Sequence, residues 1–191
     1  MALQRFVIDG YGQLELNQVA FRRDGNIEAQ CALDAEAFLK KGETNADKIL
    51  CENGMLLAID RVNRLVKLPD AEADYPIALN YSTEHMYDER ERALKDFKMY
   101  VGEFYPRLGY LKTGELFTTN CLAYDSEEFA DDEAVIDACE AIKETALYGG
   151  ACENGAIKLS ATQPEFGPVL KVVKKYTMPD GSFGLKFQVL K

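Results

Sequence analysis

Apolar and polar residues alternate along several short stretches of this chain, as they do in strands that bury one face. The clearest stretch is 182–190, where every second residue is apolar: Phe183, Leu185, Phe187 and Val189. A second apolar stretch, 169–177, is separated from it by Met-Pro-Asp-Gly, and Pro-Asp-Gly favours a tight turn. The pattern predicts a β-hairpin over 169–190.

Similar alternation predicts another hairpin in 14–33. Apolar residues flank the polar segment 22–26, whose Asp24-Gly25 pair is typical of turns between paired strands. Farther along, three apolar runs separated by polar breaks predict a three-stranded meander over 55–81. Additional strands are expected at 98–101, 105–111 and 116–124.

One amphipathic helix is expected near 132–148. Its apolar stripe recurs at i, i+4, i+7 and i+11, on Val135, Cys139, Ile142 and Ala146. Acidic residues at 131–133 would favour the start of the helix through its macrodipole, and Gly149-Gly150 would end it. The patterns together predict a mainly β (α+β) fold, a compact antiparallel arrangement of short strands and hairpins with this one helix.

The length of 191 residues fits a single β-rich domain, 1–191. A division into two lobes, about 1–125 and 150–191, joined by the helix, is the alternative organisation. The tetrapeptide Cys-Glu-Asn-Gly occurs twice, at 51–54 and 152–155. We interpret the repeat as one turn chemistry used twice, with Asn-Gly supplying a positive φ at the start of a strand.

Composition narrows the classes of function. The chain has 22 basic and 32 acidic residues and a net charge of −10, which disfavours nucleic acid and anionic membranes as partners. It has no long apolar run, and its first residues lack a secretory pattern, so synthesis in the cytoplasm is expected. Its five cysteines are an odd number without a Cys-x-x-Cys pair, and all five are predicted to be free thiols.

Residues with catalytic or metal-binding chemistry are sparse. The acidic residues of 125–133 lack the spacing of a calcium loop, and a solvated helix entrance is the favoured interpretation. The only histidine, His85, has Glu84 and Asp88 nearby but no accompanying nucleophile, so we expect no catalytic role for it. The sequence predicts no catalytic residues, no metal site and no cofactor.

Three segments, 54–60, 65–69 and 76–80, resemble the opening of head decoration proteins of tailed bacteriophages, which have a compact β-tulip fold. The resemblance extends over about 54–124. It departs from the family pattern at Ala78, where a glycine is usual, and in the charged segment and C-terminal hairpin, which have no counterpart.

The resemblance implies a non-enzymatic protein on the exterior of a virion capsid. Its partner would be the major capsid protein of a phage head, which it would stabilise, and it would also self-associate, with a trimer as one arrangement. Two alternatives remain open. One is another virion part, such as a head-tail or tail component; the other is a small cytosolic enzyme or ligand-binding domain that uses carboxylates and tyrosines.

The charged segment 82–97 is the predicted contact region. It mixes both charge signs and lacks apolar periodicity, which favours contact with a partner over packing in the core. A solvated surface loop is the alternative interpretation. The interface candidates are His85, Met86, Tyr87, Arg90 and Arg92.

Overall fold

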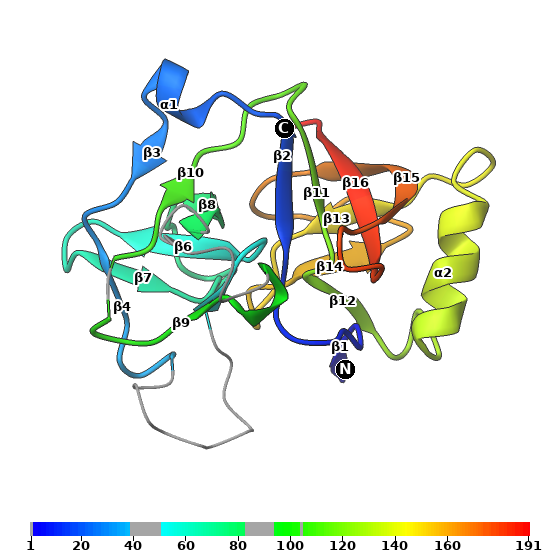
Figure 1. Cartoon of the computed structure of the whole chain (residues 1–191), viewed down its shortest axis with the longest axis horizontal. Helices are drawn as coiled ribbons and strands as arrows, with labels where there is room; N and C mark the ends of the chain where they lie inside the picture. The colour runs from blue at the N-terminus through cyan, green and yellow to red at the C-terminus, as the bar shows by residue number, and fades with distance from the viewer. Residues whose placement is uncertain (1, 39–50, 83–93, 104) are drawn as a thin grey trace.

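The computed structural model describes residues 2–38, 51–82, 94–103 and 105–191 (Figure 1). The described residues form 16 strands in three sheets and one helix longer than four residues. The expected β-rich fold with one helix is therefore confirmed. None of the described helices is long and apolar enough to cross a membrane.

The largest sheet has eight strands. Its order is β1 (Leu3–Arg5), β12 (Leu122–Asp125), β14 (Ile157–Ser160), β13 (Tyr148–Gly150), β15 (Leu170–Thr177), β16 (Phe183–Val189), β11 (Leu116–Thr119) and β2 (Leu14–Gln18). Neighbouring strands are antiparallel except β12 and β14, which run parallel. Strands from before and after the helix α2 (Asp132–Glu140) meet in this sheet, so the segments 1–125 and 150–191 share it.

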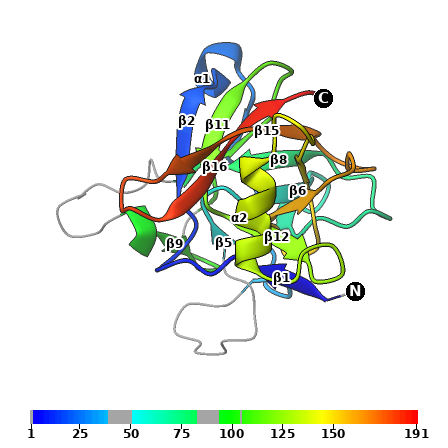
Figure 2. The same cartoon turned by 90° about the vertical axis from the view of Figure 1, so that its right-hand side faces the viewer.

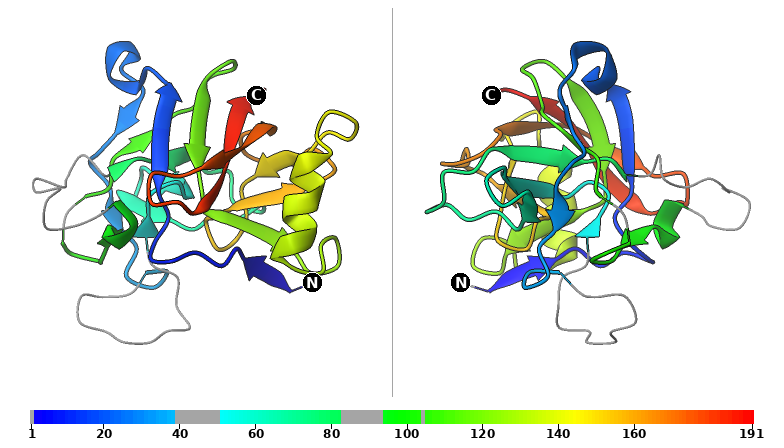
Figure 3. Two further views of the ribbon diagram at one scale, coloured as in Figure 1. Left: turned by 45° about the vertical axis from the view of Figure 1, so that its right-hand side comes forward. Right: turned by 90° about the vertical axis from the view of Figure 1, so that its left-hand side faces the viewer.

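The second sheet has six strands and faces the viewer in the right-hand view of Figure 3. Its order is β3 (Ile27–Glu28), β10 (Leu108–Gly109), β8 (Ile77–Asn80), β6 (Leu56–Asp60), β7 (Leu65–Lys67) and β4 (Ala32–Leu33). The pair β4 and β7 is parallel, so both large sheets depart from the purely antiparallel pairing that the sequence predicts. Two short strands, β5 (Cys51–Glu52) and β9 (Lys98–Met99), form a third sheet, and a 3-10 turn (Leu94–Asp96) precedes β9.

The three strands expected in 55–81 are present, but their predicted meander order is wrong. β6 lies between β7 and β8, because the chain crosses from one side of β6 to the other between β7 and β8. All five residues of β6 are buried, which fits a central strand with apolar contacts on both faces.

Two buried clusters lie on opposite faces of β6. The larger cluster joins the eight-stranded sheet, α2 and one face of the six-stranded sheet, to which β6 contributes Leu56. The smaller cluster packs on the other face, where β6 contributes Leu57 and Ile59, and it includes four of the five cysteines. The six-stranded sheet is thus a shared layer between two cores.

The hairpin predicted in 14–33 is wrong. β2 pairs with β11 in the larger sheet, whereas β3 pairs with β10 in the smaller one. Between them, residues 21–24 form a single helical turn, α1 (Phe21–Asp24), and the Phe21 ring packs 5.0 Å from the Tyr81 ring in the core. Burial of Phe21 thus redirects the chain where the local sequence favoured a turn.

The helix begins as predicted but ends at Glu140, so its expected extent of 132–148 is wrong at the C-terminal end. Asp131 is the N-cap and accepts a hydrogen bond from the Ala134 amide at 2.9 Å. The apolar stripe continues through turns to Leu147, which is buried in the core and leads into β13. Gly149 does not cap the helix: a Cβ there would lie 2.6 Å from Ile157 Cγ2, so glycine permits close packing inside the sheet.

The C-terminal hairpin is confirmed. β15 and β16 pair antiparallel along their whole length, with a bulge between Val172 and Lys174. The strand expected at 116–124 is divided into β11 and β12 by Asn120 and Cys121. All five cysteines are free and buried, as predicted.

Candidate functional site

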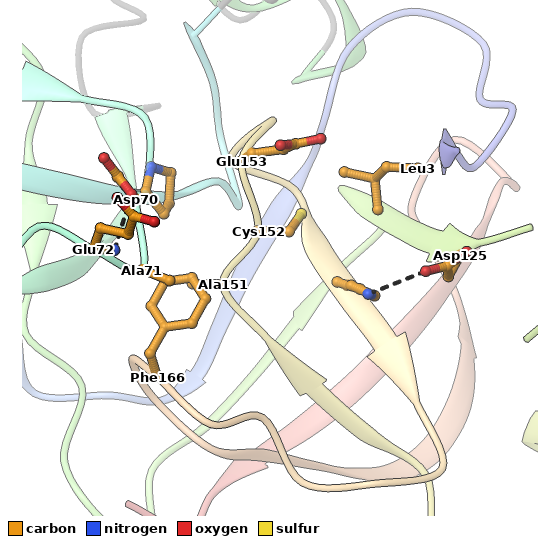
Figure 4. A pocket seen from close by; sticks show the side chains of 11 residues that line it. Leu3, Asp70, Ala71, Glu72, Asp125, Ala151, Cys152, Glu153 and Phe166 are labelled. Carbon is orange, nitrogen blue, oxygen red and sulfur yellow. Dashed lines mark hydrogen bonds and ion pairs between the residues drawn. The ribbon is translucent and has the colours of Figure 1, made fainter. Parts of the chain in front are cut away.

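A pocket of about 590 Å³ lies where the eight-stranded sheet meets the loop after β7 (Figure 4). One wall comes from β1, β12 and β14 through Leu3, Asp125 and Lys158. The facing wall comes from loops, and its residues are Pro69, Asp70, Ala71, Glu72, Ala151, Cys152, Glu153 and Phe166. Figure 4 shows the Cys152 thiol near the centre of this group, with Phe166 below it and Glu153 above it.

Asp125 is a pocket carboxylate with both an ion pair and a backbone hydrogen bond. Its Oδ1 accepts a hydrogen bond from the Glu127 amide at 3.0 Å, and its Oδ2 lies 3.5 Å from Lys158 Nζ. The amide hydrogen bond is the main cause that lowers the pKa of Asp125, and Lys158 adds to it against the opposing effect of burial. Asp125 is therefore an anion at neutral pH and is already partly neutralised by Lys158.

Cys152 is the potential nucleophile of the pocket. Burial raises its pKa to about 11, so the thiol is protonated at neutral pH. Its Sγ lies 3.0 Å from the Ala156 carbonyl oxygen and 3.1 Å from Asn154 Oδ1, and the thiol has one proton to donate to them. The pocket can offer hydrogen bonds and negative charge to a ligand, but its thiol is not activated for covalent chemistry.

Behind this wall, the two Cys-Glu-Asn-Gly segments lie close together. We call them the first turn (51–54) and the second turn (152–155). Gly54 and Gly155 have φ values of +84° and +79°, which confirms the positive φ expected for both. The Leu56 amide, just after the first turn, donates to the carbonyl of Gly155 in the second at 2.8 Å. The second turn is therefore hydrogen-bonded to the first residue of β6, which follows the first turn.

The first turn carries a largely buried ion pair. Arg5 Nη2 lies 3.3 Å from Glu52 Oε2, and the same oxygen accepts a hydrogen bond from the Gly12 amide. Asn80 donates to the Glu52 carbonyl oxygen at 2.7 Å and holds the backbone of the turn. These contacts tie the N-terminal strand to the six-stranded sheet and hold Glu52 Oε2 between Arg5 and the Gly12 amide.

The acidic segment 125–133 has structural roles. Asp131 caps α2, and Glu128 Oε1 accepts hydrogen bonds from the Ala161 amide and the Ser160 hydroxyl at 2.6 and 3.1 Å. Across the described part of the chain, no group of three or more His, Cys, Asp or Glu residues is placed to hold a metal ion. The helix-entrance interpretation fits this geometry.

The sequence-predicted interface residues, His85, Met86, Tyr87, Arg90 and Arg92, lie outside the described residues. Sequence reasoning missed the pocket, because its walls come from segments more than 150 residues apart in the chain, such as Leu3 and Phe166. The repeated tetrapeptide was the one available signal, since it placed Cys152 in a defined turn.

Comparison with known proteins gives no assignment. No family model, no curated protein and no solved structure matches this chain. The function must therefore be argued from the residues and the geometry of the chain itself.

Proposed function

We propose that this protein is a non-enzymatic virion structural protein, and specifically a decoration protein that binds the outer surface of a phage major capsid protein lattice. The resemblance over 54–124 supports the proposal. In this proposal the protein stabilises the head, self-associates, with a trimer as one arrangement, and resides on the capsid exterior.

The observation that carries the proposal is a sheet surface left open to solvent. Lys186 alternates with the buried residues Leu185 and Phe187, so it lies on the side of the sheet opposite the core. Its cross-strand partner Lys174 and the exposed Lys171 share that side. We call these three lysines the lysine face. A charged, solvent-exposed sheet surface of this kind favours association with an oppositely charged protein surface, which supports the self-association within the proposal.

The state of the thiols also supports a binding role. Burial raises the pKa of all five cysteines, and those of Cys121 and Cys139 reach about 12. Protonated thiols are weak nucleophiles. The five thiols are thus protonated and weakly nucleophilic at neutral pH, while the lysine face is presented to solvent.

The proposal is tested by quantifying the chain in purified virions of the phage or induced prophage that carries its gene. Particles are banded in a density gradient, and mass spectrometry gives the molar ratio of this chain to the major capsid protein. A decoration protein should be present in numbers that scale with the capsid subunits. A few copies per particle would instead indicate a head-tail or tail component. Production in the infected cell without incorporation into particles would refute a virion role.

The pocket beside Cys152 favours the remaining alternative, a ligand-binding domain. Its carboxylates and the Phe166 ring would suit a small molecule with a cationic group and an apolar part. Native mass spectrometry of the protein purified from its host would show a constant added mass if such a ligand is carried. Titration of the intact protein with arginine and agmatine would then test whether cations occupy the pocket.

A further inference from the structure

Charge is strongly segregated along the C-terminal third of this acidic chain. Residues 169–191 contain five lysines and one aspartate, whereas residues 125–144 contain nine acidic residues and one lysine. The first segment forms the β15–β16 hairpin, and the second contains α2. Two surfaces of opposite charge therefore occur on one molecule.

The lysine face has an unfavourable arrangement within a single copy. Lys174 and Lys186 are directly opposite in the antiparallel register, and like charges in that position destabilise a sheet. Both ammonium groups lie over the Tyr176 ring, 5.8 and 5.7 Å from its centre. Within the described ranges, no carboxylate forms an ion pair with Lys171, Lys174 or Lys186. An anionic partner would relieve the repulsion between these lysines.

The acidic surface follows one side of the helical segment. Its exposed residues within α2 recur at i, i+4 and i+7, and we call them the acidic stripe: Glu133, Asp137 and Glu140. Val135 and Cys139 are buried beneath the helix, so the acidic stripe lies on the opposite side of α2 from the core. Figure 2 shows α2 in front of the sheet, facing the viewer. Of the three, Glu140 has an ion pair with a described residue, Lys175 at 3.2 Å.

The two surfaces cannot neutralise each other within one copy. α2 packs on the core side of the eight-stranded sheet, through the cluster that holds Leu185 and Phe187. The lysine face lies on the opposite side of the same strands, as the alternation of Lys186 with those residues requires. Contact between the face and the stripe therefore requires two molecules.

We propose that the lysine face of one copy binds the acidic stripe of a second copy. Such a contact joins different surfaces of two identical chains, and it closes into a ring when the rotation between neighbours permits. This inference rests on the self-association within the proposed function and names its surfaces. It is tested with purified protein and without virions. The self-association can therefore fail while the capsid role stands, and the capsid role can fail while the self-association stands.

The test is sedimentation velocity of the full-length chain at about 20 mM and about 500 mM salt, since charge contacts weaken as the screening length shortens. We expect an oligomer at low salt that dissociates at high salt, with an association constant at least about tenfold lower. A chain that is monomeric at both salt concentrations would overturn the proposal, as would an oligomer insensitive to salt.

Paired charge reversals identify the surfaces. Lys174→Glu with Lys186→Glu keeps a like-charge cross-strand pair but reverses the face, and Glu133→Lys with Asp137→Lys reverses the stripe. Each double variant alone should be monomeric at low salt, and an equimolar mixture of the two should associate again. Circular dichroism checks folding, and Lys174→Gln with Lys186→Gln is the milder substitute if the reversed face does not fold.

The control is Arg23→Glu with Arg61→Glu, which makes the same charge change at side chains that are 80% and 61% exposed. This variant should associate as the unaltered chain does. If reversing the lysine face abolishes association but reversing the stripe does not, the occupant of the face is not α2 of a second copy, and the proposal is wrong.

Discussion

The first and second turns have the same four residues and both place their glycine at positive φ, but their surroundings differ. In the first turn, Glu52 is buried and paired with Arg5, and Cys51 is completely inaccessible. In the second turn, Glu153 is exposed at the rim of the pocket and Cys152 lines its wall. Local sequence therefore sets the positive φ of each glycine, whereas the neighbouring segments set what each side chain does.

The largest expected difference between the turns is the cost of replacing their glycines. A Cβ at Gly54 would lie 2.2 Å from Thr119 Oγ1, whereas one at Gly155 would lie 2.6 Å from Cε of the flexible Met55 side chain. At Gly54 the strain of a positive φ adds to the clash of the new Cβ. We therefore expect Gly54→Ala to lower the free energy of unfolding by about 3 to 5 kcal/mol. Gly155→Ala should cost about 1 to 2 kcal/mol, because Met55 can move.

Urea denaturation measures both values. Gly25→Ala is the control, since Gly25 has a φ of +69° and no atom within 4 Å of an added Cβ. Its loss of about 1 kcal/mol isolates the backbone strain. Equal losses for Gly54→Ala and Gly155→Ala would mean that the two sites are packed alike, contrary to the structure.

The next largest difference is the loss of stability when Glu52 of the first turn or Glu153 of the second turn is replaced. Glu52→Gln leaves the largely buried Arg5 without its charged partner, and we expect it to lower the free energy of unfolding by about 2 kcal/mol. Glu153→Gln at the exposed position should change it by less than about 0.5 kcal/mol. Thermal and urea unfolding of the two variants make the comparison. A double variant, Glu52→Gln with Arg5→Met, should recover part of the loss, and no recovery would refute the coupling of the pair.

A smaller effect concerns acid stability beside the second turn. The folded-state pKa of Asp125 lies below its ordinary value, so this group stabilises the fold above about pH 4 and loses that contribution as the pH falls through the folded pKa. Asp125→Asn should therefore be less stable than the unaltered chain at pH 7, and the difference should shrink toward pH 2. Urea unfolding at each pH tests this.

Lys158→Met separates the causes of that pKa shift. The Glu127 amide is the main cause and Lys158 a lesser one, so most of the pH dependence should persist in this variant. If Lys158→Met abolishes the pH dependence as completely as Asp125→Asn does, the ion pair, and not the amide, controls the carboxylate.

The smallest effect, with no change in stability, is thiol labelling. In the folded protein Cys152 should react with iodoacetamide before Cys51, because it lines the pocket while Cys51 is fully enclosed. With a pKa of about 11, its rate should rise about tenfold per pH unit between pH 7 and 9. Peptide mass spectrometry over time gives both rates, and equal labelling of Cys51 would show that the first turn is open.

Patterns within one segment predicted the elements that are formed by residues close together in the sequence. The alternation of Phe183, Leu185 and Phe187 predicted β16 and its hairpin, and Asp131 marked the start of α2. The turn predicted at 22–26 and the helix predicted beyond Glu140 were wrong because those predictions also used local patterns alone. Burial of Phe21 and Leu147 in the core outweighs a turn preference and a helical periodicity, respectively.

The sequence alone determined that this chain is acidic and β-rich, with five free thiols, one helix near 132 and two Asn-Gly turns that adopt positive φ. Each of these properties depends on residue type or on neighbours a few positions away. The tertiary structure decided the strand order, the hydrogen bond between β6 and the second turn, the pocket at Cys152 and the separation of the lysine face from the acidic stripe. These features arise because burying apolar side chains in two cores brings together segments that are distant in the chain, and no local pattern specifies which segments will meet.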